Sequence, residues 1–501
     1  MPKKKSQQIL KLNSLAWLSS WVLLLLSNPV FADSSIWYSS NDPLRTEALT
    51  PPAIPVGYLD TQHGAPCTVS NYNNALTLTD VAEAALCNNP QTREAYASAR
   101  VQAALVGIAK SAYLPSVNDI IAGNLNWANP EQSSRNNPYS NLSNNIVASY
   151  LLYDFGNRDA NLENARQLLQ AASATQSSVV QNVLLSAIQA YYLVQASIAA
   201  LDAALESERA SEESYKAADA RYKVGVATPA DKLQAQTLFA QNTLTRIAAE
   251  GALKTAYGTL ANVMGLAANQ ALKLAPSVSV QPLQSIDQDI NALIEQAHIR
   301  RPDLIASESQ LKAAEASIDA SRAAAKPTVF VSVSNNFQDG SNLSSTNNSA
   351  LGMTVSIPLF SGYAPTYRIR SAEAFADVRA AQRDQLRLQI SLDVWRAYQN
   401  LRTANESIRA AAVLVSSAEQ SSRVALGRYK AGVGNILETL NAQSALASAL
   451  QQQIQANLNW NIARATLAQS IGGLDNAMIQ SLPAGSNQHT GLEALPLERQ
   501  P

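Results

Sequence analysis

The sequence is poor in cysteine, aromatic residues and net charge. Two of its 501 residues are cysteine, aromatic residues make up 6%, and 37 basic residues balance 38 acidic ones. A net charge of -1 argues against a nucleic-acid-binding surface as the main role. The 47% hydrophobic share is therefore mostly Ala, Leu, Val and Ile. Alanine-rich runs favour helix because alanine loses no side-chain entropy there.

Catalytic signatures are also missing from the sequence. It contains no P-loop, no GxSxG and no HExxH motif. Its three histidines, His63, His298 and His489, are scattered along the chain, and we interpret each as an ordinary residue. We therefore expect no enzyme activity, no cofactor and no metal site.

Long hydrophobic runs are absent after the first 30 residues. Lysines at the N-terminus, the apolar stretch Leu15 to Leu26 and the small-residue site ending at Ala32 predict a signal peptide over residues 1–32. That stretch of about a dozen residues is too short for a spanning helix, which needs about 20. Beyond it we find no uncharged apolar run of about 18 residues. The mature chain is thus expected to be secreted, periplasmic or an outer-membrane β-barrel.

The two cysteines lie close together in the sequence, at Cys67 and Cys87. In an exported chain they predict one disulfide, which would tie an N-terminal extension (33–75) to the first helix. Two unpaired thiols are the alternative.

The chain is built as two copies of one plan, 76–288 and 289–474, followed by a tail (475–501) that we expect to be disordered. In each half a short amphipathic helix ends just before Pro90 or Pro302, and each proline opens the next helix. These landmarks are offset by 212 residues. The pattern predicts helices over 78–114 and 289–324, and a loose linker from about 267 to 287 that contains two prolines.

Two strand-like segments follow in each half, over 116–154 and 327–360. In the second half Val329, Val331 and Val333 alternate with small or polar residues, and the stretch from Leu351 to Leu359 does the same. The first half is similar but rougher, with Asp119 on the apolar parity. Such alternation over about 10 residues is typical of a transmembrane β-strand. A half-buried sheet of a soluble domain is the alternative.

Two very long helices come next, each followed by a tight turn and a return helix. We predict long helices over 157–224 and 364–430, and return helices over 229–265 and 435–472. The first could reach about 100 Å at 1.5 Å per residue, a length that suggests coiled-coil packing. The turns read RYKVGV and RYKAGV and are offset by 207 residues. Their glycines, Gly225 and Gly432, suit a left-handed C-terminal cap.

Four strands in one chain cannot form a closed transmembrane barrel, because bacterial single-chain barrels begin at eight strands. An open sheet edge cannot face lipid, since its unpaired N–H and C=O groups each cost several kcal/mol. Other copies of the chain must therefore complete the barrel, and a ring of identical chains is the simplest solution. The sequence alone allows two, three or four copies.

The signal peptide, the duplicated helix–hairpin–helix halves, the RYKxGV turns and the Asn-Pro after a short helix resemble TolC-like outer membrane factors. The resemblance covers roughly residues 76 to 474. It implies a mainly α fold with a transmembrane β-barrel: a homotrimer with a twelve-stranded barrel continued by a periplasmic α-helical barrel. The location would be the outer membrane of a Gram-negative bacterium.

The resemblance also implies a function, passive export through a channel opened at its periplasmic tip. The partners would be a periplasmic adaptor, an inner-membrane transporter of RND or ABC type, and outer-membrane lipid, with no nucleic acid. Drug efflux and type I protein secretion both use such channels. The alternatives are a channel dedicated to one secreted protein, or a periplasmic coiled-coil adaptor or structural protein.

Two roles carry over to the turns from this resemblance. The exposed residues there would dock adaptor hairpins: Arg221, Lys223, Gly225, Val226, Arg428, Lys430, Gly432 and Val433. The family also closes its tunnel here with acidic rings and a tyrosine-centred network. Tyr429 matches the gating tyrosine and Glu438 an acidic ring position, with Asp231 as the first-half counterpart of Glu438. The chain departs from the family pattern at Gly434, which replaces a basic residue, and at Asn441, which replaces a second acid. Plain helix capping is the alternative role for these acids.

Overall fold

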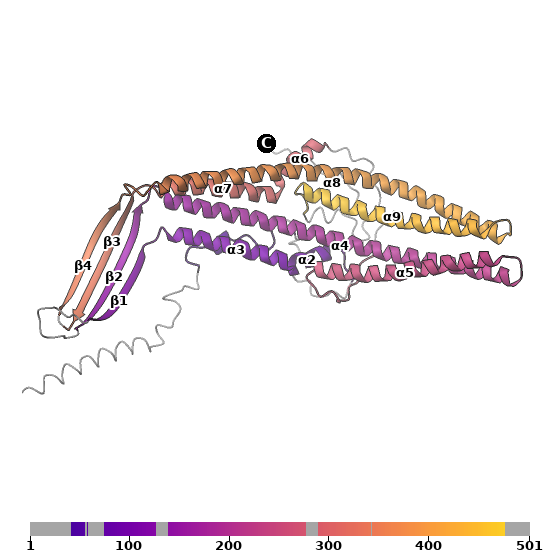
Figure 1. Cartoon of the computed structure of the whole chain (residues 1–501), viewed down its shortest axis with the longest axis horizontal. Helices are drawn as coiled ribbons and strands as arrows, with labels where there is room; N and C mark the ends of the chain where they lie inside the picture. The colour runs from indigo at the N-terminus through magenta and orange to yellow at the C-terminus, as the bar shows by residue number, and fades with distance from the viewer. Residues whose placement is uncertain are drawn as a thin grey trace, which may run out of the picture.

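The computed structural model describes residues 42–55, 58, 75–126, 139–276, 289–341 and 343–475. The predicted signal peptide, Cys67, most of the linker and all but the first residue of the predicted tail lie outside these residues. Within them the chain forms an elongated molecule with a sheet at one end and two helical turns at the other (Figure 1). A short 3-10 helix, η2 (Glu47–Leu49), precedes the repeats.

The two repeats have the same elements in the same order. A short helix, a longer helix, two strands, a 67-residue helix and a 35-residue return helix follow one another in each. The first repeat consists of α2 (Leu78–Asn88), α3 (Pro90–Ser111), β1 (Ser116–Asn126), β2 (Tyr139–Tyr153), α4 (Asn157–Lys223) and α5 (Pro229–Val263). The second consists of α6 (Ile290–Arg300), α7 (Pro302–Ala323), β3 (Thr328–Gly340), β4 (Leu343–Ser356), α8 (Ala364–Lys430) and α9 (Ile436–Ser470).

The helix boundaries have local causes that the sequence shows. Thr77 caps α2 in a capping box with Asp80, and Asn89 caps α3, whose first residue is Pro90. Thr228 and Asn435 cap the return helices α5 and α9, as expected. The helices therefore begin and end within about three residues of the predicted positions.

Both hairpins join into one antiparallel sheet of order β1-β2-β3-β4. Each half supplies the predicted pair of strands, and β2 pairs with β3 from Asn141↔Gly340 to Tyr153↔Val329. This register places the apolar alternations of all four strands on one face. Val117 pairs with Ala148, Ala148 with Val333, and Val333 with Leu351. One face is thus largely apolar near the helices, and the other carries mostly Asn, Ser, Thr and Gly.

The second hairpin ends earlier than predicted. The apolar alternation continues to Leu359, but β4 stops at Ser356. Pro358 follows, and its ring nitrogen has no hydrogen for a sheet ladder. Leu359 and Phe360 are 92% and 75% exposed in the single chain.

The helices lie side by side in two successive levels. Next to the sheet, α3 packs on α4, α4 on α7 and α7 on α8. Toward the turns, α5 packs on α4, α4 on α9 and α9 on α8. Each level is therefore a wall of four helices, with α8 at one edge and α3 or α5 at the other.

One described helix, α4, has the length and hydropathy of a membrane span over an 18-residue window. This corrects our expectation that the mature chain has no such run. Within that helix Leu184, Ile188 and Tyr191 are at most 1% exposed, and they form the main core with α2, α5 and Met264. The apolar stretch of α4 therefore lies in the middle of the helical walls.

The linker is more ordered at its start than predicted. Leu274 forms a bridge with Leu76, and the Gln195 side chain donates to the carbonyl of Ala275. Leu272 and Ala275 are buried against the first repeat. Cys87 is disulfide-bonded, while the predicted partner, Cys67, lies outside the described residues.

Candidate functional site at the helical tips

The two turns at the far end of the long helices have the same backbone. In the first, Gly225 N donates to Tyr222 O at 3.0 Å and Val226 N to Arg221 O at 3.0 Å. In the second, Gly432 N donates to Tyr429 O at 3.1 Å and Val433 N to Arg428 O at 3.0 Å. The glycine φ angles are 79° and 77°. These bonds satisfy the last carbonyls of α4 and α8, and each requires the left-handed conformation that glycine adopts freely.

The two tyrosines of the RYK turns have different surroundings. Tyr429 is 6% exposed and packs with Ala218, Ala235 and Leu440, whereas Tyr222 is 40% exposed. The guanidinium of Arg221 lies 4.1 Å from the centre of the Tyr429 ring and donates to the Tyr429 carbonyl oxygen at 2.8 Å. This contact holds the end of α4 against the end of α8. It therefore joins the two helical hairpins of one chain, α4–α5 and α8–α9.

A second polar contact joins the same two helical hairpins, farther from the turns. Ser214 Oγ of α4 lies 3.0 Å from Nε2 and 3.1 Å from Oε1 of Gln443 on α9. Ser214 is 4% exposed, and its hydroxyl also donates to the carbonyl oxygen of Ala210 at 3.0 Å. We call the Arg221–Tyr429 and Ser214–Gln443 contacts together the intrachain latch.

The predicted acids at the tip are both already engaged. The carboxylate of Asp231 accepts from Thr228 N at 3.0 Å and from Thr228 Oγ1 at 2.8 Å, in a capping box at the start of α5. The carboxylate of Glu438 accepts from Arg428 Nη1 at 2.7 Å. The geometry thus brings Tyr429 together with Arg221, and Glu438 with Arg428, while Asp231 lies on the other hairpin. An acidic ring made by several copies stays a prediction.

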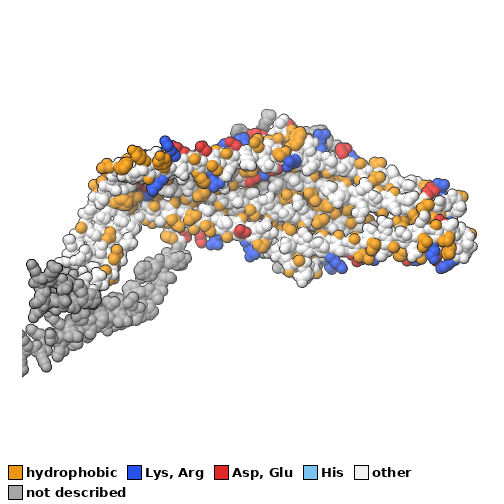
Figure 2. Space-filling model, in the orientation of Figure 1, with side chains coloured by type: hydrophobic (Ala, Val, Ile, Leu, Met, Phe, Trp, Pro, Cys, Tyr) orange, Lys and Arg blue, Asp and Glu red, His pale blue; other side chains and the backbone are white. Residues whose placement is uncertain are grey.

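Asn441 and Glu438 line a groove of about 730 Å³ between α8 and α9. Ser421, Val424, Ala425, Ala442 and Ala445 also line it. The tip end of the molecule exposes both hydrophobic and charged side chains (Figure 2). The exposed apolar residues at the turns include Val224, Val226 and Val433, each more than 70% exposed.

A carboxylate between two lysines adds a third polar contact that our sequence reasoning did not identify. Asp219 accepts from Lys223 at 2.7 Å and from Lys232 at 2.8 Å, which ties α4 to α5. Hydrogen bonds from Lys223 and then Lys232 hold the pKa of Asp219 below its usual value. The bond to Asp219 raises the pKa of Lys232. The Ser214–Gln443 contact was missed too, although the matched residues Gln236 and Gln443 are visible in the repeat.

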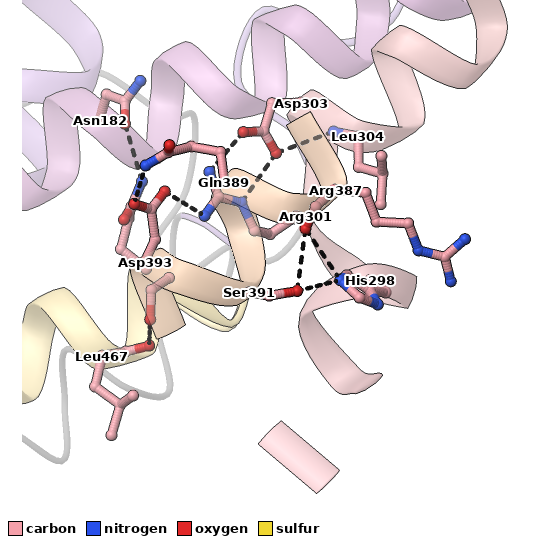
Figure 3. Close-up of polar contacts among 12 residues, drawn as sticks. Asn182, His298, Arg301, Asp303, Leu304, Arg387, Gln389, Ser391, Asp393 and Leu467 are labelled. Atoms are coloured by element: carbon pink, nitrogen blue, oxygen red, sulfur yellow. Dashed lines mark hydrogen bonds and ion pairs between the residues drawn. The ribbon is translucent and has the colours of Figure 1, made fainter. Parts of the chain in front are cut away.

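A polar cluster away from the tip joins α6, α7 and α8. At the break between α6 and α7, Arg301 binds Asp303 through two hydrogen bonds of 2.6 and 3.0 Å, and its Nη1 lies 3.4 Å from Asp393 (Figure 3). His298 Nε2 lies 3.1 Å from Ser391 Oγ. Among the described residues, no group of three or more His, Cys, Asp or Glu side chains is placed to hold a metal ion.

The comparisons with known proteins agree with this architecture. The family profile described as "Outer membrane efflux protein" matches residues 81–266 and 293–473, one segment in each repeat. The chain belongs to the outer membrane efflux protein family. Its members are transport channels, so the protein is an outer-membrane channel subunit with a large periplasmic part.

Two curated relatives of this efflux family span most of the chain. Protein CyaE of Bordetella pertussis is 30% identical over 415 residues, covering 81% of this chain and 86% of its own length. Outer membrane protein TolC of Vibrio cholerae is 24% identical over 431 residues, covering 83% and 95%. Among solved structures, the Campylobacter jejuni CmeC outer membrane channel has a TM-score of 0.72 at 17% identity, covering 79% and 86%. The predicted family and fold class are thus confirmed.

Proposed function

We propose that three copies of this efflux-family chain close into one continuous tube, a twelve-stranded barrel above a twelve-helix tunnel. One observation carries the proposal: the free edges of the sheet and of the helical walls lie on the same two sides of the chain. The sheet ends at β1 and β4, and each helical wall ends at α3 or α5 on one side and α8 on the other. β1 leads directly from α3, and β4 leads directly into α8. One head-to-tail contact therefore covers every free edge at once.

Exposed apolar side chains follow those same edges. Val101, Leu105 and Ile108 form an i, i+4, i+7 stripe on α3, exposed by 57%, 40% and 65%. On α8 the matching exposed residues are Leu388, Leu392, Val413 and Val424, and on α5 they are Leu233, Leu244 and Ile247. Such stripes on both outer helices support burial against another copy. The family comparison supports three copies as the number that closes the ring.

The tube would be a passive exit duct that is opened at its tip. In the efflux family, a periplasmic adaptor and an inner-membrane transporter complete the pump, and we assign the same partners here. The docking surface would be made by these turn residues: Arg221, Lys223, Gly225, Val226, Arg428, Lys430, Gly432 and Val433. The intrachain latch would be part of the closed gate. The cargo, drug-like molecules or a secreted protein, is left to experiment.

Planar-bilayer recording of the purified protein tests this function. We expect a detergent-extracted, heat-modifiable trimer with low conductance. Charge-changing substitutions at Tyr429 and Glu438 are expected to raise that conductance. A monomer in detergent would contradict the ring. A trimer whose conductance ignores both substitutions would contradict the gate and leave the fold intact. Drug sensitivity of a deletion strain, compared with its secreted proteins, separates the two kinds of cargo.

A further inference from the structure

A groove runs between α7 and α8, which lie side by side next to the sheet (Figure 1). It holds about 420 Å³, and its lining includes Glu315 and Ile318 of α7 and Glu373, Asp377 and Arg383 of α8. The other face of this wall is concave, because residues of α3, α4, α7 and α8 all line one hollow of about 800 Å³ there. The α7–α8 groove therefore lies on the convex face, which would be the outside of the proposed ring.

The equivalent groove of the first repeat, between α3 and α4, is filled by residues 42–55, which we call the N-terminal strap. Thr46 of the strap lies so close to α3 that a Cβ on Gly107 would be 2.8 Å from its methyl carbon. On α4, Gln176 Nε2 donates to the carbonyl oxygens of Pro52 and the next residue at 2.9 and 3.0 Å. The part of the strap after η2 forms neither helix nor strand and contains three prolines. An extended segment thus lies across both helices.

The α7–α8 groove lacks such a cover among the residues that the structure describes. Residues of α3 and α7 correspond at an offset of 212, and those of α4 and α8 at 207. Val106 is 0% exposed, whereas its counterpart Ile318 is only half-buried. Gln176 is also 0% exposed, whereas the side chain of its counterpart Arg383 is 31% exposed. Arg383 bonds Asp384 through Nε and Nη2, and a guanidinium has five N–H donors, so donors remain for another acceptor.

The two grooves differ in charge. The second repeat has carboxylates at three lining positions where the first repeat has none: Glu315, Glu373 and Asp377, in place of Ala103, Arg166 and Gln170. Arg383 is the one basic residue in this lining, which leaves an excess of two negative charges. Arg322 beside it pairs with Asp319 as well as with Glu373, so that excess is unchanged. The strap carries two acids and one arginine and binds next to Lys110, so its charge suits the first groove and not the second.

We propose that the α7–α8 groove binds an extended, basic segment of a second periplasmic polypeptide, laid across the two helices as the N-terminal strap is laid across α3 and α4. Arg383 would donate to main-chain carbonyls of that segment, in the place of Gln176. Lysine or arginine side chains of the segment would pair with Glu315, Glu373 and Asp377. The inference goes beyond the proposed export function and needs the groove of one chain only. In the proposed ring, three such grooves would alternate with three strap-filled ones.

Peptide binding to the full-length, detergent-extracted protein tests the proposal. The basic probe is a fluorescent peptide with the strap sequence 42–55 carrying Asp42→Lys and Glu47→Lys, and the comparison probe keeps the natural sequence. Fluorescence anisotropy is expected to show roughly tenfold tighter binding of the basic probe, the sum of a few exposed ion pairs. Its affinity should fall at high salt, because exposed charges are screened. Equal affinity for the two probes, or no binding of the basic one, overturns the proposal.

Two pairs of substitutions locate the binding. Glu373→Gln with Asp377→Asn removes two carboxylates of the groove and is expected to weaken binding of the basic probe roughly fivefold. Asp202→Asn with Glu206→Gln removes two exposed acids of α4 outside the groove and is expected to leave the affinity unchanged. Equal weakening by both pairs overturns the site, because the probe would then respond to overall charge. A monomeric chain that still binds the probe would instead overturn the proposed ring, so the two failures are distinguishable.

Photo-cross-linking in intact cells identifies the occupant. The photoreactive residue p-benzoylphenylalanine replaces Ile318 in the otherwise unmodified chain. We expect an adduct with a different polypeptide, and we expect it to disappear when Glu373→Gln and Asp377→Asn are added. An adduct between two copies of this chain overturns the proposal, since a neighbour would then fill the groove. The absence of any adduct, or an adduct that survives removal of the two carboxylates, also overturns it.

Discussion

At the break between its first two helices, the first repeat carries Asn89 and the second carries Arg301. Asn89 caps α3 by accepting from Gln91 N at 2.9 Å, and its Nδ2 donates to Val263 O at 3.0 Å. Arg301 makes no such cap and binds Asp303 and Asp393 instead. The backbones nevertheless match. Duplicated glycines and prolines thus fix the chain path, while the polar side chains on it have diverged into different contacts.

Substituting the glycines that end the return helices should give the largest loss of stability. Each of them combines a left-handed backbone with a close contact to another backbone segment. Gly265 has φ 71°, and a Cβ there would lie 2.5 Å from the backbone oxygen of Asn88. Left-handed strain of about 1–3 kcal/mol and overpacking of about 1–3 kcal/mol predict that Gly265→Ala lowers the free energy of unfolding by roughly 3 kcal/mol. Thermal unfolding of the detergent-solubilised protein measures this loss.

Two matched glycines sharpen the test. Gly472 has φ 73° with the nearest backbone atom at 2.9 Å, so Gly472→Ala should fall slightly below Gly265→Ala. Gly225 has φ 79° with nothing within 4 Å, so Gly225→Ala should lose only about 1 kcal/mol. Equal losses of unfolding free energy at all three positions would show that close contact with the break between α2 and α3, or between α6 and α7, adds nothing to the cost.

Replacing Arg301 should cost more than replacing Asn89. Arg301→Met removes the charged partner of two partly solvated carboxylates, a loss we set at about 2 kcal/mol after solvent screening. Asn89→Ala removes an N-cap, worth about 1 kcal/mol. Chemical denaturation of the two variants compares them. Arg301→Lys is the control, and it should recover only part of the loss because lysine cannot bind a carboxylate with two parallel bonds. A larger loss at Asn89 would reverse the comparison.

At the tip, Arg221→Gln should open the channel through loss of the ring contact and the carbonyl bond. A cation–π contact worth about 0.5–2 kcal/mol corresponds to a roughly two- to thirtyfold larger open population. Arg209→Gln is the control, because Arg209 lies on the same helix, is 72% exposed and only approaches Glu213 at 4.0 Å. If Arg221→Gln and Arg209→Gln conduct alike in bilayers, Arg221 is not part of the gate.

The smallest expected effect is the change of conductance with pH. Asp219 has a lowered pKa, so its contribution to stability is present above its unfolded pKa of about 3.9 and is lost as pH falls below that value. Lys232 has a raised pKa, so its contribution disappears only in strongly alkaline solution. Conductance should therefore stay constant from about pH 5 to 9 and rise near pH 4 or below. The variant Asp219→Asn should abolish that acid rise. A rise between pH 5 and 7 would point to another group.

Much of the fold could be predicted from the sequence because the same pattern of prolines, glycines and alternation occurs twice. Pro90 and Pro302 predicted the helix breaks, Gly225 and Gly432 predicted the turns, and alternation near Val331 predicted the strands. The register between β2 and β3 was not predicted, since it depends on how the helices bring the two strands together. The extent of β4 was overestimated because periodicity alone continues through Pro358.

The tip was predicted in part. The resemblance pointed to Tyr429, but no pattern identified Arg221 as its partner, because the two residues are 208 positions apart and meet only when α4 lies beside α8 and α9. The matched glutamines, Gln236 and Gln443, were visible in the sequence as part of the repeat. The pairing of Gln443 with Ser214 needed the order of helices in the wall, which only the structure supplies.

Each wall of four helices continues from a sheet of four strands, so the proposed ring would hold twelve of each. Backbone hydrogen bonds join neighbouring strands, so the diameter of a closed barrel is fixed by the number and tilt of its strands. Neighbouring helices contact each other through side chains and can slide past one another. In the proposed ring, any widening of the passage would therefore take place among the helices, while the sheet keeps one diameter.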